Sequence, residues 1–252
     1  MTDLAYLADL PSAYVRSFRA RVTALPPGAV VLDRTYFYPT GGGQPADHGT
    51  LQDAEGHRFD VVDVTKSGTA VVHRIRAPPE AVRHLAVGAA LDGELDWDRR
   101  YRHMRLHTAQ HLTSALVFAR TGRRTRRAEL ANVAATIDLD GPFAADELDP
   151  VAQDVREAVA HARPVTVRHV PRAEWDALPA SGRSGLVPLP RAVDPVRVVE
   201  IDAADVCPCG GTHVRATSEI GEIRFRPPEP LGGSATRLGF SLVDGARPTP
   251  TA

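Results

Sequence analysis

The sequence predicts an α+β fold in two parts, and three observations support this. Up to about residue 97, short runs rich in Val, Tyr and Phe are separated by turn residues, a pattern typical of a small β-barrel or sandwich. From about residue 98, helical patterns alternate with strand patterns, which predicts helices packed on an antiparallel sheet. The chain has 252 residues, of which 43% are hydrophobic, so each part can bury a core of its own.

The first part contains four predicted strands. "AVVLDRTYFY" at 29–38 predicts a strand that runs into the glycine-rich loop "PTGGGQPADHG" at 39–49. Residues 59–75 predict two strands joined by a turn at Ser67-Gly68, and residues 87–97 alternate as another strand. These strands favour a small barrel or a sandwich.

The second part begins with a predicted helix over 99–120 that ends before Gly122. A second helix is predicted from Val151 to about Ala162, with Asp149 as its cap and Pro150 in its first turn. The Pro-, Gly- and Ser-rich segment 171–195 predicts a long surface loop. Strands are predicted at 128–140, 165–170 and 196–201, and a closing strand pair at 219–226 and 236–243.

Composition limits the classes of function. There is no run of 18 apolar residues, and the N-terminus has acids early and no signal-peptide pattern, so we expect a cytoplasmic protein without a membrane span. A net charge of −1 does not by itself indicate a nucleic-acid partner. Arginines cluster at 99–105 and 120–127, and each cluster fits either a solvated surface or an RNA contact.

Two residue pairs predict a metal site. His107 and His111 are four apart on a predicted helix, so their imidazoles point to one face. Cys209 and His213 have the same spacing across Gly210-Gly211-Thr212, which favours a tight turn. Either pair alone is common without a metal, but together they supply the N₃S donor set that suits one Zn²⁺ per chain.

The chain has only one other cysteine, Cys207, and two cysteines exclude a disulfide scaffold. Cys207 is an alternative ligand to Cys209. The turn glycines follow Cys209 directly, so we expect Cys207 to be a small buried residue or a group beside the ligands.

Three motifs carry a family resemblance. "RRYRHMRLHTAQHL" at 99–112 and "CGGTHVRATSEIGEIRF" at 209–225 resemble the editing domain of alanyl-tRNA synthetases. Asp33 to Gly49 resembles the free-standing alanyl-tRNA editing proteins of the AlaX type. The resemblance covers nearly the whole chain. It implies a small β-barrel-like domain over 1–97, followed by a zinc-binding editing domain over 98–252 that forms a two-layer α/β sandwich with an antiparallel sheet.

The resemblance also implies an activity. Members hydrolyse the wrong amino acid, chiefly serine and with glycine as a second candidate, from mischarged tRNA(Ala). By similarity, the zinc ligands are His107, His111, Cys209 and His213. We expect no membrane partner. The oligomeric state stays open, with a monomer favoured because the chain shows no sustained heptad seam.

Two segments depart from the family pattern. Synthetases carry a His-x-Gln-x-Gly-Ser stretch after the metal helix, whereas this chain reads "RRAELANVA" and offers no glutamine there. Near the C-terminus "EPLGGSATRLGF" keeps the glycines and Arg237 of the family but lacks its lysines. RNA contacts carried over to these segments are therefore less complete than in the family.

Other residues are predicted at the site. Thr108 and Thr212 flank ligand histidines and can meet the seryl hydroxyl; the alternative is ordinary helix and turn hydrogen bonding. The loop of Gly41, Gly42, Gly43 and Gln44 is expected near the editing pocket, where Gln44 meets substrate and the glycines allow close backbone approach; the alternative is a plain hairpin loop. The tRNA contacts are expected from Arg105, Arg123, Arg124 and Arg237.

Four protein ligands close a zinc site, whereas ester hydrolysis needs an open position. We therefore expect His213 to be the least firmly bound ligand, or the zinc to orient substrate without activating water. Three other functions stay open: a zinc-stabilised RNA-binding module without turnover, editing of a different mischarged tRNA, and protection of a producer against an unusual amino acid.

Overall fold

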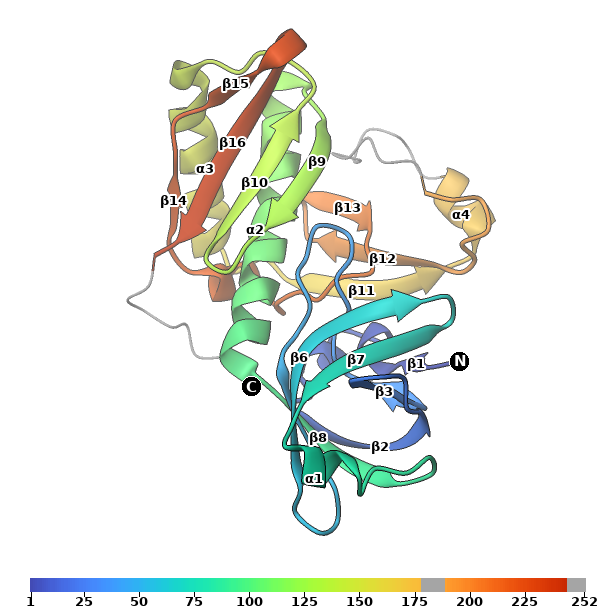
Figure 1. Cartoon of the computed structure of the whole chain (residues 1–252). Coiled ribbons are helices and arrows are strands. Elements are labelled where there is room, and N and C mark those ends of the chain that lie inside the picture. The colour runs from blue at the N-terminus through green and yellow to red at the C-terminus, as the bar shows by residue number, and fades with distance from the viewer. Residues whose placement is uncertain (178–188, 244–252) are drawn as a thin grey trace. The chain divides into compact units, whose positions relative to one another are not determined.

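The computed structural model describes residues 1–177 and 189–243, and the chain divides into two compact units, residues 1–102 and 103–252 (Figure 1). Each unit is described by itself below. The two units have different architectures, and together they make the chain an α+β protein built on a barrel and antiparallel sheets.

The first unit is a closed six-stranded antiparallel barrel, which decides between the barrel and the sandwich. Its core is formed by residues that alternate inward, such as Phe18, Val22 and Leu91, while Arg19 and Arg21 point outward. A short parallel pair, β1 (Asp3–Leu4) with β4 (Arg34–Thr35), and a helical turn α1 (Pro79–Val82) lie outside the barrel order. Around the barrel the strands are β2 (Ser17–Ala24), β3 (Ala29–Leu32), β7 (Ala70–Arg76), β6 (Arg58–Ser67), β5 (Gly49–Gln52) and β8 (Ala90–Leu95).

The predicted strand at 29–38 is wrong in its second half. It divides into β3 and β4 around Asp33, whose carboxylate accepts hydrogen bonds from the backbone N–H groups of Arg21 and Arg34. Residues 36–39 then leave the strand conformation. The strand β2 was not predicted, although its inward and outward residues alternate over eight positions.

The second unit contains two antiparallel sheets and two long helices. The larger sheet has the order β14 (Ile223–Phe225), β16 (Ala235–Leu242), β10 (Ala134–Leu139) and β9 (Thr125–Leu130), and β15 (Glu229–Leu231) also pairs with β16. Helices α2 (Trp97–Thr121) and α3 (Leu148–Ala160) lie on one face of this sheet (Figure 1). The smaller sheet is β11 (Val165–Val170), β12 (Val196–Ile201) and β13 (Asp205–Pro208).

The prediction of α2 is confirmed. The helix ends at Thr121, and Gly122 follows with a φ of 71°, a left-handed conformation that favours glycine. The closing strand pair is confirmed as β14 and β16, and β11 and β12 match their predicted ranges.

Three expectations for the second unit are corrected. The single strand at 128–140 is a hairpin of β9 and β10, because the chain turns at residues 131–133. Asp149 is not a cap, since α3 begins at Leu148 with Glu147 at the cap position. The predicted loop at 171–195 contains the helix α4 (Arg172–Ala177), and its residues 178–188 lie outside the described part.

In the described residues, no helix is long and apolar enough to cross a membrane.

Candidate metal centre

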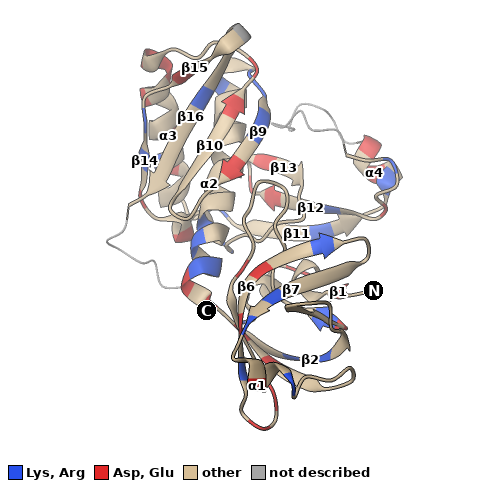
Figure 2. Ribbon diagram, viewed as in Figure 1, with Lys and Arg blue, Asp and Glu red and all other residues tan. Residues whose placement is uncertain are grey.

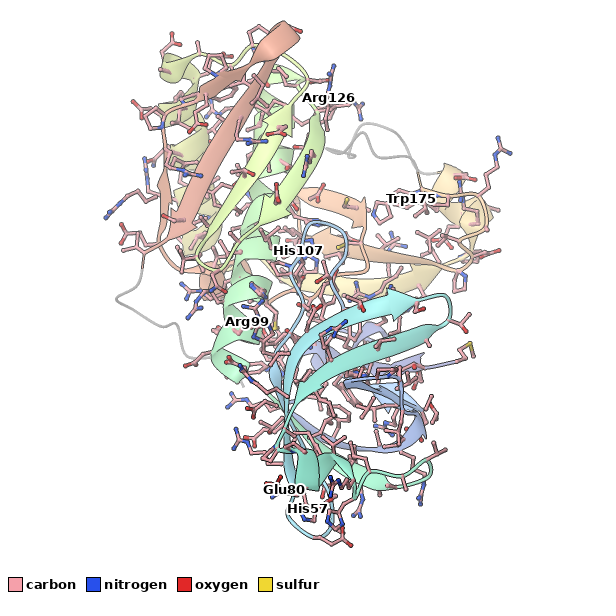
Figure 3. The ribbon with its side chains drawn as sticks, viewed as in Figure 1. His57, Glu80, Arg99, His107, Arg126 and Trp175 are labelled. Carbon is pink, nitrogen blue, oxygen red and sulfur yellow. The ribbon has the colours of Figure 1, made fainter. Side chains whose placement is uncertain are left out.

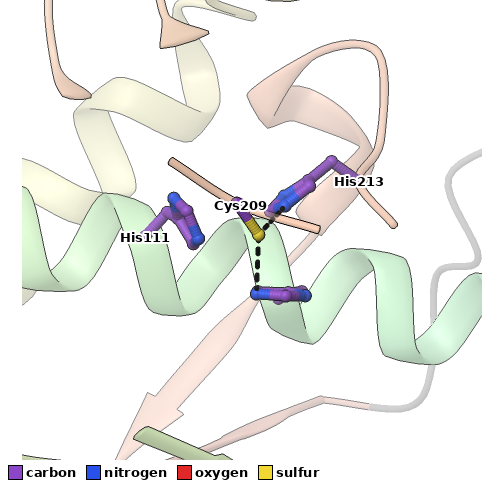
Figure 4. A group of neighbouring side chains, drawn as sticks. His111, Cys209 and His213 are labelled. Atoms are coloured by element: carbon purple, nitrogen blue, oxygen red, sulfur yellow. Dashed lines mark hydrogen bonds between the residues drawn. The ribbon is translucent and has the colours of Figure 1, made fainter. Parts of the chain in front are cut away.

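The two predicted residue pairs meet in the second unit. His107 and His111 lie on one face of α2, and Cys209 and His213 come from the loop that follows β13 (Figures 3 and 4). One ligand atom from each of the four side chains lies within 4.8 Å of every other. Segments about a hundred residues apart therefore present three imidazoles and one thiol to a common centre.

The spacing of the donors suits a tetrahedral zinc ion. Cys209 Sγ lies 3.5 Å from His107 Nε2 and 3.3 Å from His213 Nε2. A tetrahedral ion with Zn–S of about 2.3 Å and Zn–N of about 2.0–2.1 Å separates sulfur and nitrogen ligands by about 3.5 Å. The three histidines are 5% exposed or less and Cys209 is half-buried, so the imidazole donors are shielded from solvent.

The second nitrogens of two histidines are held by neighbouring side chains. Nδ1 of His111 lies 3.1 Å from Oδ2 of Asp205, and Nδ1 of His213 lies 3.2 Å from Oγ1 of Thr108. Thr108 Oγ1 also accepts the backbone N–H of Val214 at 3.2 Å. These contacts leave Nε2 of both rings for the centre, the usual arrangement around metal-bound histidine.

Sequence reasoning missed Asp205. It lies four residues before Cys209 in "DVCPC", outside either spacing motif. The available signal was strand alternation, which places Asp205 and Cys207 on the same face of β13. Val206 packs the opposite way, against the cluster of Val170, Trp175, Val196 and Val198.

Electrostatics favour a thiolate at Cys209, a neutral imidazole at His213 and a charged imidazolium at His111. Burial by itself raises the pKa of Cys209, but His107 and His213 reverse this and hold it well below its usual range. Burial and the neighbouring His107 lower the pKa of His213 to about 3. Burial also opposes the charge of His111, yet its hydrogen bonds to Asp205 and Cys209 raise its pKa to about 10. A thiolate and neutral imidazole are the forms that bind metal, so metal binding at this cluster would release a proton from His111.

Backbone contacts fix the Cys209 loop. The N–H of Gly211 donates to Cys209 Sγ at 3.2 Å, a bond that favours the thiolate. The N–H of Cys209 donates to the carbonyl of Arg197 at 3.1 Å, and the Arg197 guanidinium donates to the carbonyl of Cys209 at 2.5 Å. The loop is therefore attached to β12 on both sides of the cysteine.

Cys207 lies outside the four-residue cluster. Its thiol is close to Asp205 and His111 in a smaller group. Burial, then the charges of Asp205 and Cys209, raise its pKa well above the ordinary value, so it stays a protonated thiol, which binds metal poorly.

The other predicted substrate residues are distributed over both units. Thr212 is fully buried in the Cys209 loop, while the glycine loop belongs to the first unit. Gly42 and Gly43 have φ of 56° and 82°, and backbone bonds join Gly41 and Gln44 in both directions. The positive φ at both central positions is by itself a reason for glycine there, without any contact to substrate. Gln44 is buried. Roles for these residues in substrate contact stay predictions.

The arginines differ in availability. Arg100 and Arg105 are buried; Arg105 donates to the carbonyl of Ile220 at 2.9 Å. The half-buried Arg123 pairs with Glu147 at 2.7 Å, and Arg237 pairs with Asp138 at 2.7 Å. Arg124 packs over the ring of Phe118. Basic residues also lie on β9 itself (Figure 2), where Arg126 and Arg127 are exposed. Contacts of the four predicted arginines with tRNA stay predictions.

Known protein families match two separate segments of the chain. Residues 12–99 match the family described as class II (A) tRNA synthetases. Residues 196–239, which include Cys209 and His213, match the threonyl and alanyl tRNA synthetase second additional domain. Both ends of the sequence are thus similar to parts of aminoacyl-tRNA synthetases.

Relatives extend the similarity over the full length. The alanyl-tRNA editing protein AlaX-M of Methanosarcina barkeri is 33% identical over 97% of this chain and 100% of its own length. That of Saccharolobus solfataricus is 32% identical over 96% of this chain and 99% of its own length. An alanine–tRNA ligase of Pyrobaculum neutrophilum is 34% identical over 95% of this chain but only 28% of its own length. The chain therefore belongs to the AlaX-M family of alanyl-tRNA editing proteins.

Proposed function

We propose that the protein is a trans-editing, zinc-dependent aminoacyl-tRNA hydrolase. It deacylates mischarged tRNA(Ala), chiefly Ser-tRNA(Ala) and also Gly-tRNA(Ala). The observation that carries the proposal is the N₃S cluster of His107, His111, Cys209 and His213, in a chain similar over its full length to proteins named as alanyl-tRNA editing proteins. In this proposal residues 1–97 form the N-terminal domain, and residues 98–252 form a two-layer α/β sandwich that carries the editing site.

Such an enzyme answers a limit on selectivity in aminoacylation. A pocket built for alanine distinguishes a side chain that differs by one small group by only about 1–3 kcal/mol. A second site that hydrolyses the wrong ester removes the error. A separate chain can supply this site after the mischarged tRNA has left the synthetase.

The chain's own residues prepare the site. Gly211 N–H and the nearby imidazoles stabilise the Cys209 thiolate. Thr108 holds the His213 ring through Nδ1 and is itself fixed by Val214 N–H. When bound, Zn²⁺ would polarise the ester carbonyl or lower the pKa of a bound water. The close packing around the cluster restricts bulk water, which strengthens electrostatic interactions there.

One observation favours a second candidate, a zinc-stabilised RNA-binding module without turnover. Four protein donors converge, and structural zinc sites are closed in this way, whereas catalytic sites keep one position open. The catalytic proposal therefore includes a departure or lengthening of one ligand, for which His213 is our candidate.

The decisive experiment is a panel of charged tRNAs. We expect release of free serine from Ser-tRNA(Ala), slower release of glycine from Gly-tRNA(Ala), and no release from Ala-tRNA(Ala) or from a mischarged tRNA(Thr). Cys209→Ala should reduce serine release by about a hundredfold or more, since a Lewis acid contributes several kcal/mol to such a reaction. Far-UV circular dichroism checks that the variant is folded.

The outcomes separate the candidates. Zinc binding and tRNA binding without release of any amino acid would support the module without turnover. Turnover of a different mischarged tRNA would replace the proposed substrate while keeping the hydrolase. Full activity in the folded Cys209→Ala variant would contradict the role of the cluster.

A further inference from the structure

Asp205 is a buried carboxylate whose surroundings need an explanation. It begins β13, its side chain is 1% exposed, and Oδ2 lies 3.1 Å from Nδ1 of His111. Removing a carboxylate from water costs several kcal/mol unless it is paired and hydrogen-bonded. The contact with His111 supplies such a partner.

The direction of this contact decides its effect. An ionised carboxylate only accepts hydrogen bonds, so the imidazole presents Nδ1–H to Asp205. In a neutral ring the other nitrogen, Nε2, then carries the free electron pair. His111 is thereby prepared to donate through Nε2 toward the side of the ring where Cys209, His107 and His213 gather.

We propose that Asp205 is the positioning residue of the metal centre: it fixes the tautomer and the orientation of His111, so that Nε2 faces the other three ligands. This inference rests on the proposed metal centre. Asp205 does not contribute a ligand of its own, because its carboxylate lies on the Nδ1 side of the ring.

The same strand supplies a matched control. Cys207 lies two residues after Asp205 on the same face of β13 and is close to the same imidazole. A thiol makes only weak hydrogen bonds, so Cys207 cannot fix the ring. The proposal therefore predicts that replacing Asp205 weakens Zn²⁺ binding much more than replacing Cys207, although the two side chains have similar positions.

The test measures Zn²⁺ affinity of the full-length protein by competition with a chromophoric chelator. Asp205→Ala should weaken binding by about 10- to 100-fold, the usual effect of removing a partner of a ligand histidine. Asp205→Asn should lose less, because its amide oxygen still accepts the Nδ1–H bond while the charge is gone. Cys207→Ala should bind like the wild type.

A second measurement reports on the ring itself. Long-range ¹H–¹⁵N correlation of the zinc-loaded protein should show His111 protonated on Nδ1 in the wild type and in Cys207→Ala. In Asp205→Asn, which keeps the shape of the side chain and should fold, the Nδ1–H resonance should remain but shift upfield. A residue that served only folding would leave this resonance unchanged in the folded variant.

The outcomes distinguish the two levels of inference. If the wild type binds no Zn²⁺, the metal centre and the role of Asp205 are both wrong. If the wild type binds tightly and folded Asp205→Ala binds equally well, only the role of Asp205 is wrong. A loss in Cys207→Ala as large as in Asp205→Ala would also overturn it, since both residues would then act as ligands.

Discussion

Both units bury histidine, but they surround it with different partners. In the barrel, His73 is fully buried; its Nδ1–H donates to the carbonyl of Val30 at 3.2 Å, and Nε2 accepts the hydroxyl of Thr35 at 2.8 Å. In the second unit, His111 has the Asp205 carboxylate on one side and the Cys209 thiolate on the other. Burial dominates at His73 and lowers its pKa to about 4, whereas the charged partners of His111 raise its pKa to about 10.

The comparison shows how a structural histidine differs from a candidate ligand. Both ring nitrogens of His73 are used by neutral groups of the barrel, so none remains for an ion. His111 and His213 each have Nδ1 bonded and Nε2 directed at the cluster. Burial alone does not distinguish a structural histidine from a candidate ligand. The group that contacts the second ring nitrogen does distinguish them.

The units also differ in how they pair a buried carboxylate. Asp47 pairs with Arg100 in the first unit, where both side chains are fully buried. Arg100 also donates to the carbonyls of Ala13 and Tyr36, and Asp47 accepts the N–H of Tyr38 at 2.6 Å. The partner of Asp47 is a guanidinium, whereas the partner of Asp205 is an imidazole, whose Nε2 can give up its proton to bind a metal.

The largest effect on stability should follow from breaking the Asp47–Arg100 pair. Arg100→Met leaves an uncompensated buried carboxylate and should lower the free energy of unfolding by about 3–5 kcal/mol. Urea denaturation measures it. The double variant with Asp47→Asn should recover part of the loss, because the isolated charge is gone. An Arg100→Met protein as stable as the wild type would show that the pair is not a structural anchor.

Substituting one histidine in each unit tests the comparison directly. His107→Ala removes a cluster donor and should reduce deacylation of Ser-tRNA(Ala) about a hundredfold or more. His73→Gln should keep the turnover of each folded molecule, because His73 only fills the barrel. The measurement is kcat/KM, corrected for the folded fraction. Equal losses in the two variants would remove the distinction between the histidines.

The barrel histidine should make stability depend on pH. Burial lowers the pKa of His73 to about 4 in the folded protein, from an ordinary value of 6.5, so the unfolded chain binds a proton first as pH falls. Its contribution is complete above about pH 6.5 and declines toward pH 4, by about 3 kcal/mol. Denaturation of wild type and His73→Gln from pH 7 to 4 isolates this change. A His73 that titrates near pH 6.5 by NMR would contradict it.

Two threonines of α2 provide a smaller and closely matched test. Thr108→Val leaves His213 Nδ1 and Val214 N–H without their shared partner. It should lower the free energy of unfolding by about 1–3 kcal/mol. Thr113 is equally buried, and within the described residues its hydroxyl has no hydrogen-bond partner. Thr113→Val should therefore be neutral or slightly stabilising. Thermal unfolding compares the two variants, and a reversed order of stability would contradict the role of Thr108 as the shared hydrogen-bond partner.

The smallest effect is expected at the exposed arginines of β9. If Arg126 and Arg127 contact phosphates, replacing each by Glu should weaken tRNA binding several-fold and reduce the slope of log K against log salt by about 1 per contact. Arg19, which is exposed on the barrel and near Asp92 at 3.7 Å, is the control for a general loss of positive charge. Unchanged binding at low salt in the double variant would exclude β9 from the RNA surface.

The sequence predicted the parts of this molecule that depend on local spacing. The pairs His107 with His111 and Cys209 with His213 were identified from four-residue intervals, and α2 from its long pattern and the following glycine. Asp205 has no such interval, because its partner lies 94 positions away. Arg100 was expected in a basic surface cluster, and only tertiary structure shows that its partners are inside the protein. The hairpin at 128–140 was missed because Asn132-Val133 is a weak turn signal.

The separation of the ligand pairs has a consequence for how the protein matures. His107 and Cys209 are 102 positions apart, so a ribosome finishes the first pair long before it adds the second. Until Cys209 and His213 are added, the growing chain holds only two of the four side chains of the cluster, and all four come together once the second unit has folded. Any ligand that requires all four donors favours the finished protein over its precursors by mass action.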